Sequence, residues 1–320
     1  MIRKMTVAVP DLTEEHREKI RAAADRNGLE VRFLNVPGDD PSFLNQAEIV
    51  FGHLPETAGT SHALKWICTP YAGVDQFLAP GVFANPEALL SNSSGAYGVT
   101  IAEHVMMLLL EILRRQPEYR KIVAAREWKR DLKIRSVKDS RITLLGTGDI
   151  GRETALRLKS FLPACITGVN RSGKNPGGCF DRIVDAENWE TVLSGTDVLI
   201  ISLPGTKQTF HMVGERQLSL LPDGAVMINV GRGSVVDQAA LISELKRGRL
   251  HAGLDVFEKE PLPGDDPAWE LPNLLITPHT AGNMTLPYTV NRIVEMFLED
   301  LDAYCAGRSP ARLVDRDRGY

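Results

Sequence analysis

The sequence predicts an α/β fold with two domains, each built around a parallel sheet. The chain has 320 residues, which is long for a single hydrophobic core. Short apolar segments alternate with amphipathic segments of helical length in both halves, as parallel strands joined by helices require. In the second half, the apolar segments are nearly continuous runs of Val, Ile and Leu. Such runs are typical of strands buried on both faces.

The first half predicts five strands and one clear helix. The helix covers residues 14–24, between the first two strands, and Gly28 is suited to end it. The expected strands are centred on Val7, Val31, Val50, Ile67 and Leu90.

A long apolar helix is predicted over residues 100–115, and its two final arginines suit a helix C-terminus. Residues 116–140 are charged and lack a strong period. A second series of strands then begins at Arg141, with the segments RITLLG, CITGVN, DVLIISLP, AVMINVG, HAGLDVF and LLITP. A last helix is expected over residues 286–304.

Charge and cysteine content argue against several classes of protein. The formal net charge is -4, so we expect no nucleic-acid partner. The basic residues of 126–135 are interleaved with acids, as on a solvated face. The four cysteines, Cys68, Cys165, Cys179 and Cys305, lack the spacing of a metal site. We expect reduced thiols and no bound metal.

The N-terminus and the apolar segments indicate in which part of the cell the protein is expected. The N-terminus turns polar too early for a secretory signal peptide. The longest apolar run, 105–110, is far shorter than the roughly 18 residues of a membrane span. We therefore expect a cytoplasmic protein without a membrane partner.

The segment GTGDIG joins the strand RITLL to the helix that follows it. Glycines in this setting permit a tight turn, close approach of the backbone to a pyrophosphate, and packing of helix on strand. The helix N-terminus adds free N–H groups and the positive end of its dipole. The first candidates for dinucleotide binding are therefore Gly146, Gly148, Asp149, Ile150 and Gly151. A glycine-rich turn without a ligand is the alternative.

The end of the next strand bears on the choice of coenzyme. An acidic residue there commonly binds the ribose 2′-hydroxyl of NAD. Here the position holds Asn170, followed by Arg171, Ser172 and Lys174, and residues 154–180 contain no acid. An arginine can bind a 2′-phosphate that a carboxylate would repel. NADP(H) is therefore favoured and NAD(H) remains possible, because Arg171 could instead stack on the adenine.

The segments GTGDIG, INVGRGSVVD, GLDVFEKEPLP and TPHTAG, with YAGVD in the first domain, occur in an order and spacing that resemble one family. This family is the D-isomer-specific 2-hydroxyacid dehydrogenases, glyoxylate/hydroxypyruvate reductases included, and the resemblance covers nearly the whole chain. It implies hydride transfer between NADP(H) or NAD(H) and a small D-2-hydroxy acid/2-oxo acid pair. It also implies two Rossmann-like or flavodoxin-like domains, with a coenzyme domain (99–287) inserted into a discontinuous substrate domain (1–98 and 288–320). Helix 100–115 and the segment after it resemble the family's dimer contact, so a homodimer is expected.

The resemblance implies a catalytic role for three residues. Arg232 follows the strand AVMINV and would grip the carboxylate and carbonyl of a 2-oxo acid. His279 follows the strand LLITP and would exchange a proton with the substrate oxygen. Glu260 would orient His279 and favour its charged form, with Glu258 as the rival carboxylate. His104, within the apolar helix, is expected to be structural.

Further contacts follow from the same resemblance. Asp255 is similar to the acid that contacts the nicotinamide carboxamide, and the backbone of Ala72 and Gly73 to the loop that holds the substrate carboxylate. Tyr71 and His53 are expected to line the substrate pocket. We also expect coenzyme contacts from His279 and from Leu203, Pro204, Val230, Gly231 and Gly282.

Two other functions fit the same motifs. One is phosphoglycerate dehydrogenase, although the chain ends near its last helix and leaves no room for the regulatory domain that some of these enzymes carry. The other is a dinucleotide-sensing interaction protein like the C-terminal-binding-protein corepressors, which the lack of long disordered tails slightly disfavours. Turnover of 2-oxo acids by the purified protein separates the enzymes from the interaction protein.

Overall fold

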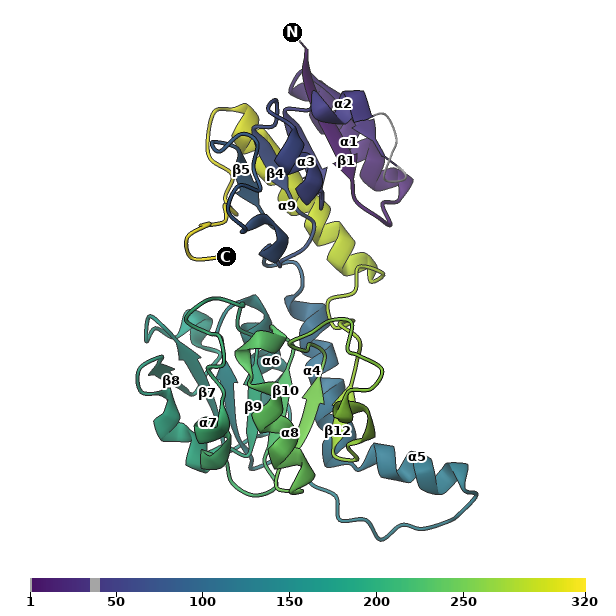
Figure 1. The fold of residues 1–320 in the computed structure, drawn as a ribbon, viewed down its shortest axis with the longest axis vertical. Coiled ribbons are helices and arrows are strands. Elements are labelled where there is room, and N and C mark those ends of the chain that lie inside the picture. Colours follow the sequence, from purple (N-terminus) through teal and green to yellow (C-terminus); the bar gives the residue numbers. More distant parts are fainter. Residues whose placement is uncertain (1, 35–40) are drawn as a thin grey trace. The chain divides into compact units, whose positions relative to one another are not determined.

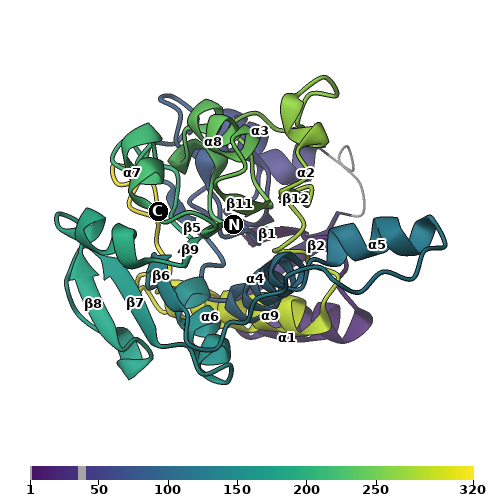
Figure 2. The same ribbon diagram turned by 90° about the horizontal axis from the view of Figure 1, so that it is seen from below.

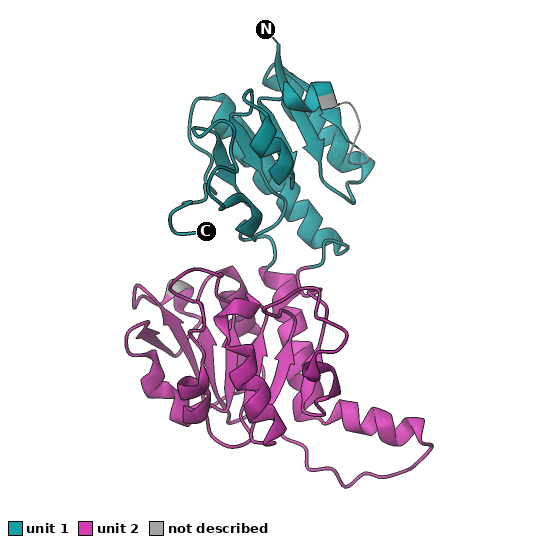
Figure 3. Cartoon of the chain, viewed as in Figure 1, with its two compact units in different colours: residues 1–97, 283–320 teal, residues 98–282 magenta. Residues whose placement is uncertain are grey.

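The chain forms two compact units in a computed structural model that describes residues 2–34 and 41–320 (Figure 3). Unit 1 comprises Met1–Tyr97 and Asn283–Tyr320, and unit 2 comprises Gly98–Gly282. The second division thus lies at 282/283, whereas the sequence predicts 287/288. The segment that leads into the last helix makes its contacts within unit 1, which is why the division precedes the helix.

Unit 1 contains a parallel sheet with the strand order β2-β1-β3-β4-β5 (Figure 1). All five strands predicted for the first half are present, and α1 is capped by the side chain of Thr13. Helix α9 packs against α1, and its Phe297 stacks on Phe51 of β3 with ring centroids 3.8 Å apart. The elements are β1 (Arg3–Ala8), α1 (Glu14–Arg26), β2 (Leu29–Phe33), α2 (Pro41–Asn45), β3 (Ile49–Gly52), α3 (Pro55–Thr60), β4 (Trp66–Cys68), β5 (Leu89–Ser91) and α9 (Pro287–Cys305).

Unit 2 contains a larger parallel sheet with the strand order β12-β11-β10-β9-β6-β7-β8. The order reverses between β6 and β9, where open α/β sheets bind ligands beyond the carboxyl ends of their strands. Helices α4 and α6 lie side by side (Figure 2). The elements are α4 (Gly98–Leu113), α5 (Gln116–Ala124), β6 (Arg141–Leu145), α6 (Asp149–Lys159), β7 (Cys165–Asn170), β8 (Arg182–Asp185), β9 (Val198–Ile201), α7 (Glu215–Leu220), β10 (Val226–Asn229), α8 (Gln238–Lys246), β11 (His251–Leu254) and β12 (Leu274–Ile276). The predicted fold class is confirmed.

Strand β8 and helix α5 of unit 2 are absent from the sequence prediction, which also gave no separate bounds for α7 and α8. Strand β8 lies at the edge of the sheet and mixes exposed with buried positions, so it lacks the long apolar run of the central strands. Helix α5 projects from the unit (Figure 1) and none of its residues is buried. A helix of nine residues without a buried side chain offers only a short apolar stripe to detect. The turn into it is made by Arg115, whose backbone is left-handed with φ 57°.

Candidate active site

The glycine loop lies between β6 and α6, at the point where the strand order of unit 2 reverses. A Cβ atom on Gly151 would lie 2.1 Å from the carbonyl oxygen of Gly146, so helix and loop can meet only through glycine. Gly148 begins α6 without a side-chain cap, and a Cβ atom there would meet open space. The carboxylate of Asp149 accepts a hydrogen bond of 2.7 Å from Gly98 N. The Asp149 carboxylate thus bonds within the protein, and the uncapped N-terminus of α6 begins beside open space at Gly148.

A polar turn at the end of β7 adjoins this loop. The side-chain amide of Asn170 donates hydrogen bonds of 2.8 Å to the Thr147 hydroxyl and to the Lys174 carbonyl. Its oxygen accepts a hydrogen bond from Ser172 N. Arg171, Ser172 and Lys174 are exposed. Asn170 therefore holds two cationic side chains on a turn beside the glycine loop.

Arg232 lies beyond the carboxyl end of β10, two strands from the glycine loop. The Asn229 side chain shapes its turn by accepting from Gly231 N at 3.0 Å and donating to the Arg232 carbonyl at 2.9 Å. A Cβ atom on Gly231 would lie 2.5 Å from the Leu203 carbonyl oxygen, so the turns after β9 and β10 are in close contact. Arg232 itself is half-buried.

His279 and Glu260 form a hydrogen-bonded pair beyond the ends of β11 and β12. Nδ1 of His279 lies 2.6 Å from Oε2 of Glu260, and the side chains are 50% and 35% exposed. The second carboxylate oxygen of Glu260 accepts a hydrogen bond of 2.9 Å from Phe257 N. The rival, Glu258, instead accepts from Gln238 N and pairs with His211, at 2.9 Å in both cases. Of the two carboxylates that the sequence left open, Glu260 is thus the partner of His279.

Asp255 lies between these segments and is almost fully buried, with 1% of its surface exposed. Its carboxylate accepts hydrogen bonds from the Thr277 hydroxyl and from the backbone of the turn that contains His279. His104 of α4 lies 2.9 Å from the same hydroxyl. The sequence did not single out Thr277, and His104 was expected to be structural, because the hydrogen bond between them joins α4 to a residue far along the chain.

The remaining coenzyme candidates are spread over the same loops. Val230 and Gly231 are buried, and four others are partly buried: Ile150, Leu203, Pro204 and Gly282. Buried or glycine positions would offer backbone groups to a ligand, whereas Ile150, Leu203 and Pro204 would offer apolar surface.

The substrate candidates of the first domain lie in unit 1. Ala72 and Gly73 are partly buried, and the Ala72 carbonyl accepts a hydrogen bond of 2.8 Å from the Asn92 side chain. Nδ1 of His53 lies 2.9 Å from the Thr69 hydroxyl, and the ring of Tyr71 meets the His53 ring edge-on, with centroids 5.1 Å apart. The loop that contains the N–H groups of Ala72 and Gly73 is thus held in place by the hydrogen bond to the Ala72 carbonyl.

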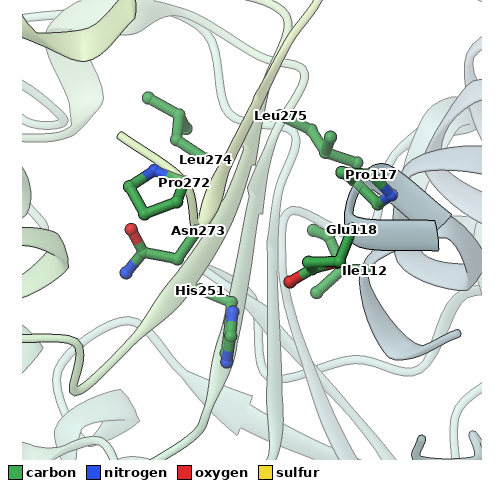
Figure 4. A pocket seen from close by; sticks show the side chains of 8 residues that line it. All are labelled: Ile112, Pro117, Glu118, His251, Pro272, Asn273, Leu274 and Leu275. Carbon is green, nitrogen blue, oxygen red and sulfur yellow. The ribbon is translucent and has the colours of Figure 1, made fainter. Parts of the chain in front are cut away.

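A separate hollow lies at the opposite edge of the same sheet, where β11 and β12 begin (Figure 4). Residues from the α4–α5 junction face the starts of the two strands across it. Its lining is Ile112, Pro117, Glu118, His251, Pro272, Asn273, Leu274 and Leu275. Because open α/β sheets bind substrates at their carboxyl edge, this hollow lies apart from the candidate site.

In residues 2–34 and 41–320, no group of three or more His, Cys, Asp or Glu side chains is placed to hold a metal ion. No helix in these same ranges is long and apolar enough to cross a bilayer.

The sheet order and glycine loop of unit 2 define an NAD(P)-dependent oxidoreductase with a Rossmann-like coenzyme fold. The chain belongs to the D-isomer specific 2-hydroxyacid dehydrogenase family, whose NAD-binding domain profile matches residues 106–281. It is an NAD(P)-dependent enzyme that acts on a small hydroxy or oxo acid.

Individual relatives agree with this assignment. A glyoxylate reductase of Korarchaeum cryptofilum is 33% identical over 238 residues, which are 71% of this chain and 69% of the relative. A D-isomer specific 2-hydroxyacid dehydrogenase family protein of Aeromonas salmonicida superposes with a TM-score of 0.88 and 29% identity, over 99% of this chain and 100% of that one. An NADPH-dependent glyoxylate/hydroxypyruvate reductase of Sinorhizobium meliloti, solved with NADP and sulfate, has a TM-score of 0.82 and 27% identity, with coverages of 99% and 100%.

Proposed function

We propose that the protein is an NADPH-preferring reductase of small 2-oxo acids, of the glyoxylate and hydroxypyruvate class, that forms D-2-hydroxy acids. The observation that carries the proposal is the His279–Glu260 pair of 2.6 Å, which lies at the same sheet edge as Arg232 and the glycine loop. This edge combines a proton donor, an anion-binding guanidinium and a site for a dinucleotide, which are the groups that reduction of a 2-oxo acid needs.

The residues of unit 2 have distinct roles in this proposal. Arg232 binds the substrate carboxylate and polarises the carbonyl, because a planar guanidinium can bond to both. His279 uses Nδ1 for Glu260, so Nε2 is the atom that gives a proton to the carbonyl oxygen. Glu260 holds the ring orientation through its contact with Nδ1. When bound, the nicotinamide supplies the hydride.

The glycine loop is suited to the coenzyme. Open space over Gly148 leaves room for a pyrophosphate at the start of α6. Asp255 would accept from the nicotinamide carboxamide through Oδ2, which already accepts from Ala281 N. The preference for NADP(H) is supported by Arg171 and Lys174 at the end of β7.

The two units have separate roles in the proposal. Unit 2 is the coenzyme domain, and unit 1 the substrate domain, where the N–H groups of Ala72 and Gly73 hold the substrate carboxylate. A homodimer through α4 and the α5 arm, meaning α5 with the segment after it up to residue 135, is supported by the arm's exposed apolar side chains, Val123 at 70% and Trp128 at 95%. None of the four cysteines, all of which lie in the described residues, forms a disulfide, which supports a reducing, cytoplasmic setting.

The test is a steady-state panel of the purified protein with glyoxylate, hydroxypyruvate, pyruvate and bulkier 2-oxo acids, each with NADPH and NADH. We expect the highest kcat/KM with NADPH and one of the two smaller polar acids. Turnover restricted to a phosphorylated acid would indicate a phosphoglycerate dehydrogenase instead. Coenzyme binding without turnover of any acid would indicate an interaction protein.

A further inference from the structure

The backbone at His279 is held in an unfavourable conformation. Its φ is 52°, in the left-handed region that residues with a Cβ seldom adopt. Such a conformation costs on the order of 1–3 kcal/mol and persists only where surrounding contacts impose it. His279 N bonds to the carbonyl oxygens of Asp255 (2.9 Å) and Thr277 (3.0 Å). The turn is therefore tied to the end of β11.

The buried carboxylate of Asp255 imposes the rest of the turn. Oδ1 accepts from Thr280 N at 2.9 Å, and Oδ2 accepts from Ala281 N at 3.0 Å. These two donors flank His279 on its C-terminal side. A charged acceptor makes such bonds stronger than neutral ones. Asp255 thereby fixes the peptide units on which the direction of the His279 side chain depends.

A third donor to Asp255, the Thr277 hydroxyl, connects the carboxylate to helix α4. The Thr277 hydroxyl donates to Oδ1 across 2.5 Å. Because this hydroxyl has one proton, it must accept from its other neighbour, Nε2 of His104, at 2.9 Å. The hydrogen bonds run from His104 through Thr277 to Asp255. Burial lowers the pKa of His104, although nearby Asp255 opposes the shift, so a neutral ring with its proton on Nε2 fits this direction.

We propose that His104 and Thr277 are positioning residues for His279, acting through Asp255. The chain of hydrogen bonds holds the buried carboxylate in the one orientation that supports the left-handed turn. His104 comes from α4, so the place of the His279 ring depends on packing between this helix and the end of the sheet. The inference rests on the proposed proton-donor role of His279.

The test compares Thr277→Val, which removes the hydroxyl at nearly constant shape, with Thr277→Ser, which keeps it. Thr277→Val should lower kcat for 2-oxo acid reduction by about tenfold or more, corresponding to at least about 1.4 kcal/mol. Thr277→Ser should stay within about threefold of wild type. The Kd for NADPH, measured by coenzyme fluorescence, should rise by less than kcat falls, because Asp255 Oδ2, the proposed acceptor for the nicotinamide carboxamide, keeps its bond from Ala281 N. His104→Gln, whose side-chain amide can still donate, should retain more activity than His104→Leu.

A double-mutant cycle separates positioning from a general structural effect. In a His279→Gln background, Thr277→Val should cause almost no further loss, because the group that it positions is gone. Equal losses in both backgrounds, or full activity of Thr277→Val, would overturn the inference. If Thr277→Val does not fold, the cycle is run with His104→Gln and His104→Leu. Full activity of His279→Gln alone would instead overturn the proton-donor role, and with it the proposed function.

Discussion

Nδ1 of His279 lies 2.6 Å from Oε2 of Glu260. The neighbouring carboxylate, Glu258, is engaged by His211 and by the start of α8. Pairing through Nδ1 directs the other ring nitrogen away from Glu260. The geometry thus fixes the orientation of the ring, which can be tested by substitution.

Glu260→Gln removes the charge of the pair and preserves its size. The Nδ1 atom of His279 then loses its charged acceptor, so the ring is held less firmly and reductive kcat/KM should fall by about tenfold or more, corresponding to at least about 1.4 kcal/mol. The Kd for coenzyme should change little. The measurement is steady-state kinetics in both directions, with Glu258→Gln as the matched control. An unchanged kcat/KM in Glu260→Gln would remove Glu260 from the mechanism.

Arg232→Ala should severely reduce turnover of 2-oxo acids and leave the Kd for coenzyme nearly unchanged. Loss of one partner of a charged pair with the substrate carboxylate costs on the order of 2–5 kcal/mol. Steady-state kinetics and a coenzyme titration measure the two effects separately. Arg232→Lys should recover only part of the activity, because an ammonium cannot form the planar, two-pronged contact. A variant that keeps more than about a tenth of wild-type kcat/KM would refute the assignment.

Coenzyme choice should depend on Arg171 and Lys174. Their double replacement by Ala should raise the KM for NADPH and leave the KM for NADH almost unchanged, since one charged hydrogen bond contributes roughly 1.5–3 kcal/mol. Asn170 is left intact because its amide holds the turn to Thr147. Lys138→Ala, at an exposed position of the same unit, is the control for loss of positive charge. A wild-type enzyme with higher kcat/KM for NADH would contradict the proposed preference.

Substitution of Gly151 should affect the stability of the fold, whereas substitution of Gly148 should affect coenzyme binding. Gly151→Ala would place Cβ 2.1 Å from the Gly146 carbonyl oxygen, so Tm should fall, as overpacking costs about 1–3 kcal/mol or more. Gly148→Ala meets open space, so its Tm should match that of wild type while coenzyme binding weakens. Thermal unfolding without coenzyme and a fluorescence titration give both quantities. A normal Tm for Gly151→Ala would show that loop and helix do not pack as described.

The α5 arm should control assembly. Replacing the exposed Val123 and Trp128 together by Ser should shift the protein from dimer to monomer, because a dimer contact of this kind depends on burial of large apolar side chains. Sedimentation velocity at several concentrations measures the change. Phe161→Ser, at another exposed apolar position (40%) of unit 2, is the control. A wild-type monomer, or a variant that dimerises as tightly as wild type, would exclude this contact.

Much of the fold follows from local sequence patterns. Continuous apolar runs mark the central strands of unit 2, and the glycines of GTGDIG mark the turn between β6 and α6. These signals are local because each depends on the period of one segment or on the conformational freedom of one residue. Strand β8 and helix α5 escaped prediction because an edge strand and a projecting helix bury little apolar surface. The periodic signal is weakest in such elements.

Patterns in the sequence predict the two-sheet α/β architecture, the position of the glycine loop and a short set of polar residues expected at strand ends. Which of these side chains meet depends on the packing of the folded chain. This packing pairs His279 with Glu260 rather than Glu258, and it brings His104 of α4 to Thr277. The apolar runs and glycines that mark strands and turns are local features of the sequence, whereas these contacts join residues from separate loops and a distant helix. Their distances depend on how the elements pack around the sheet.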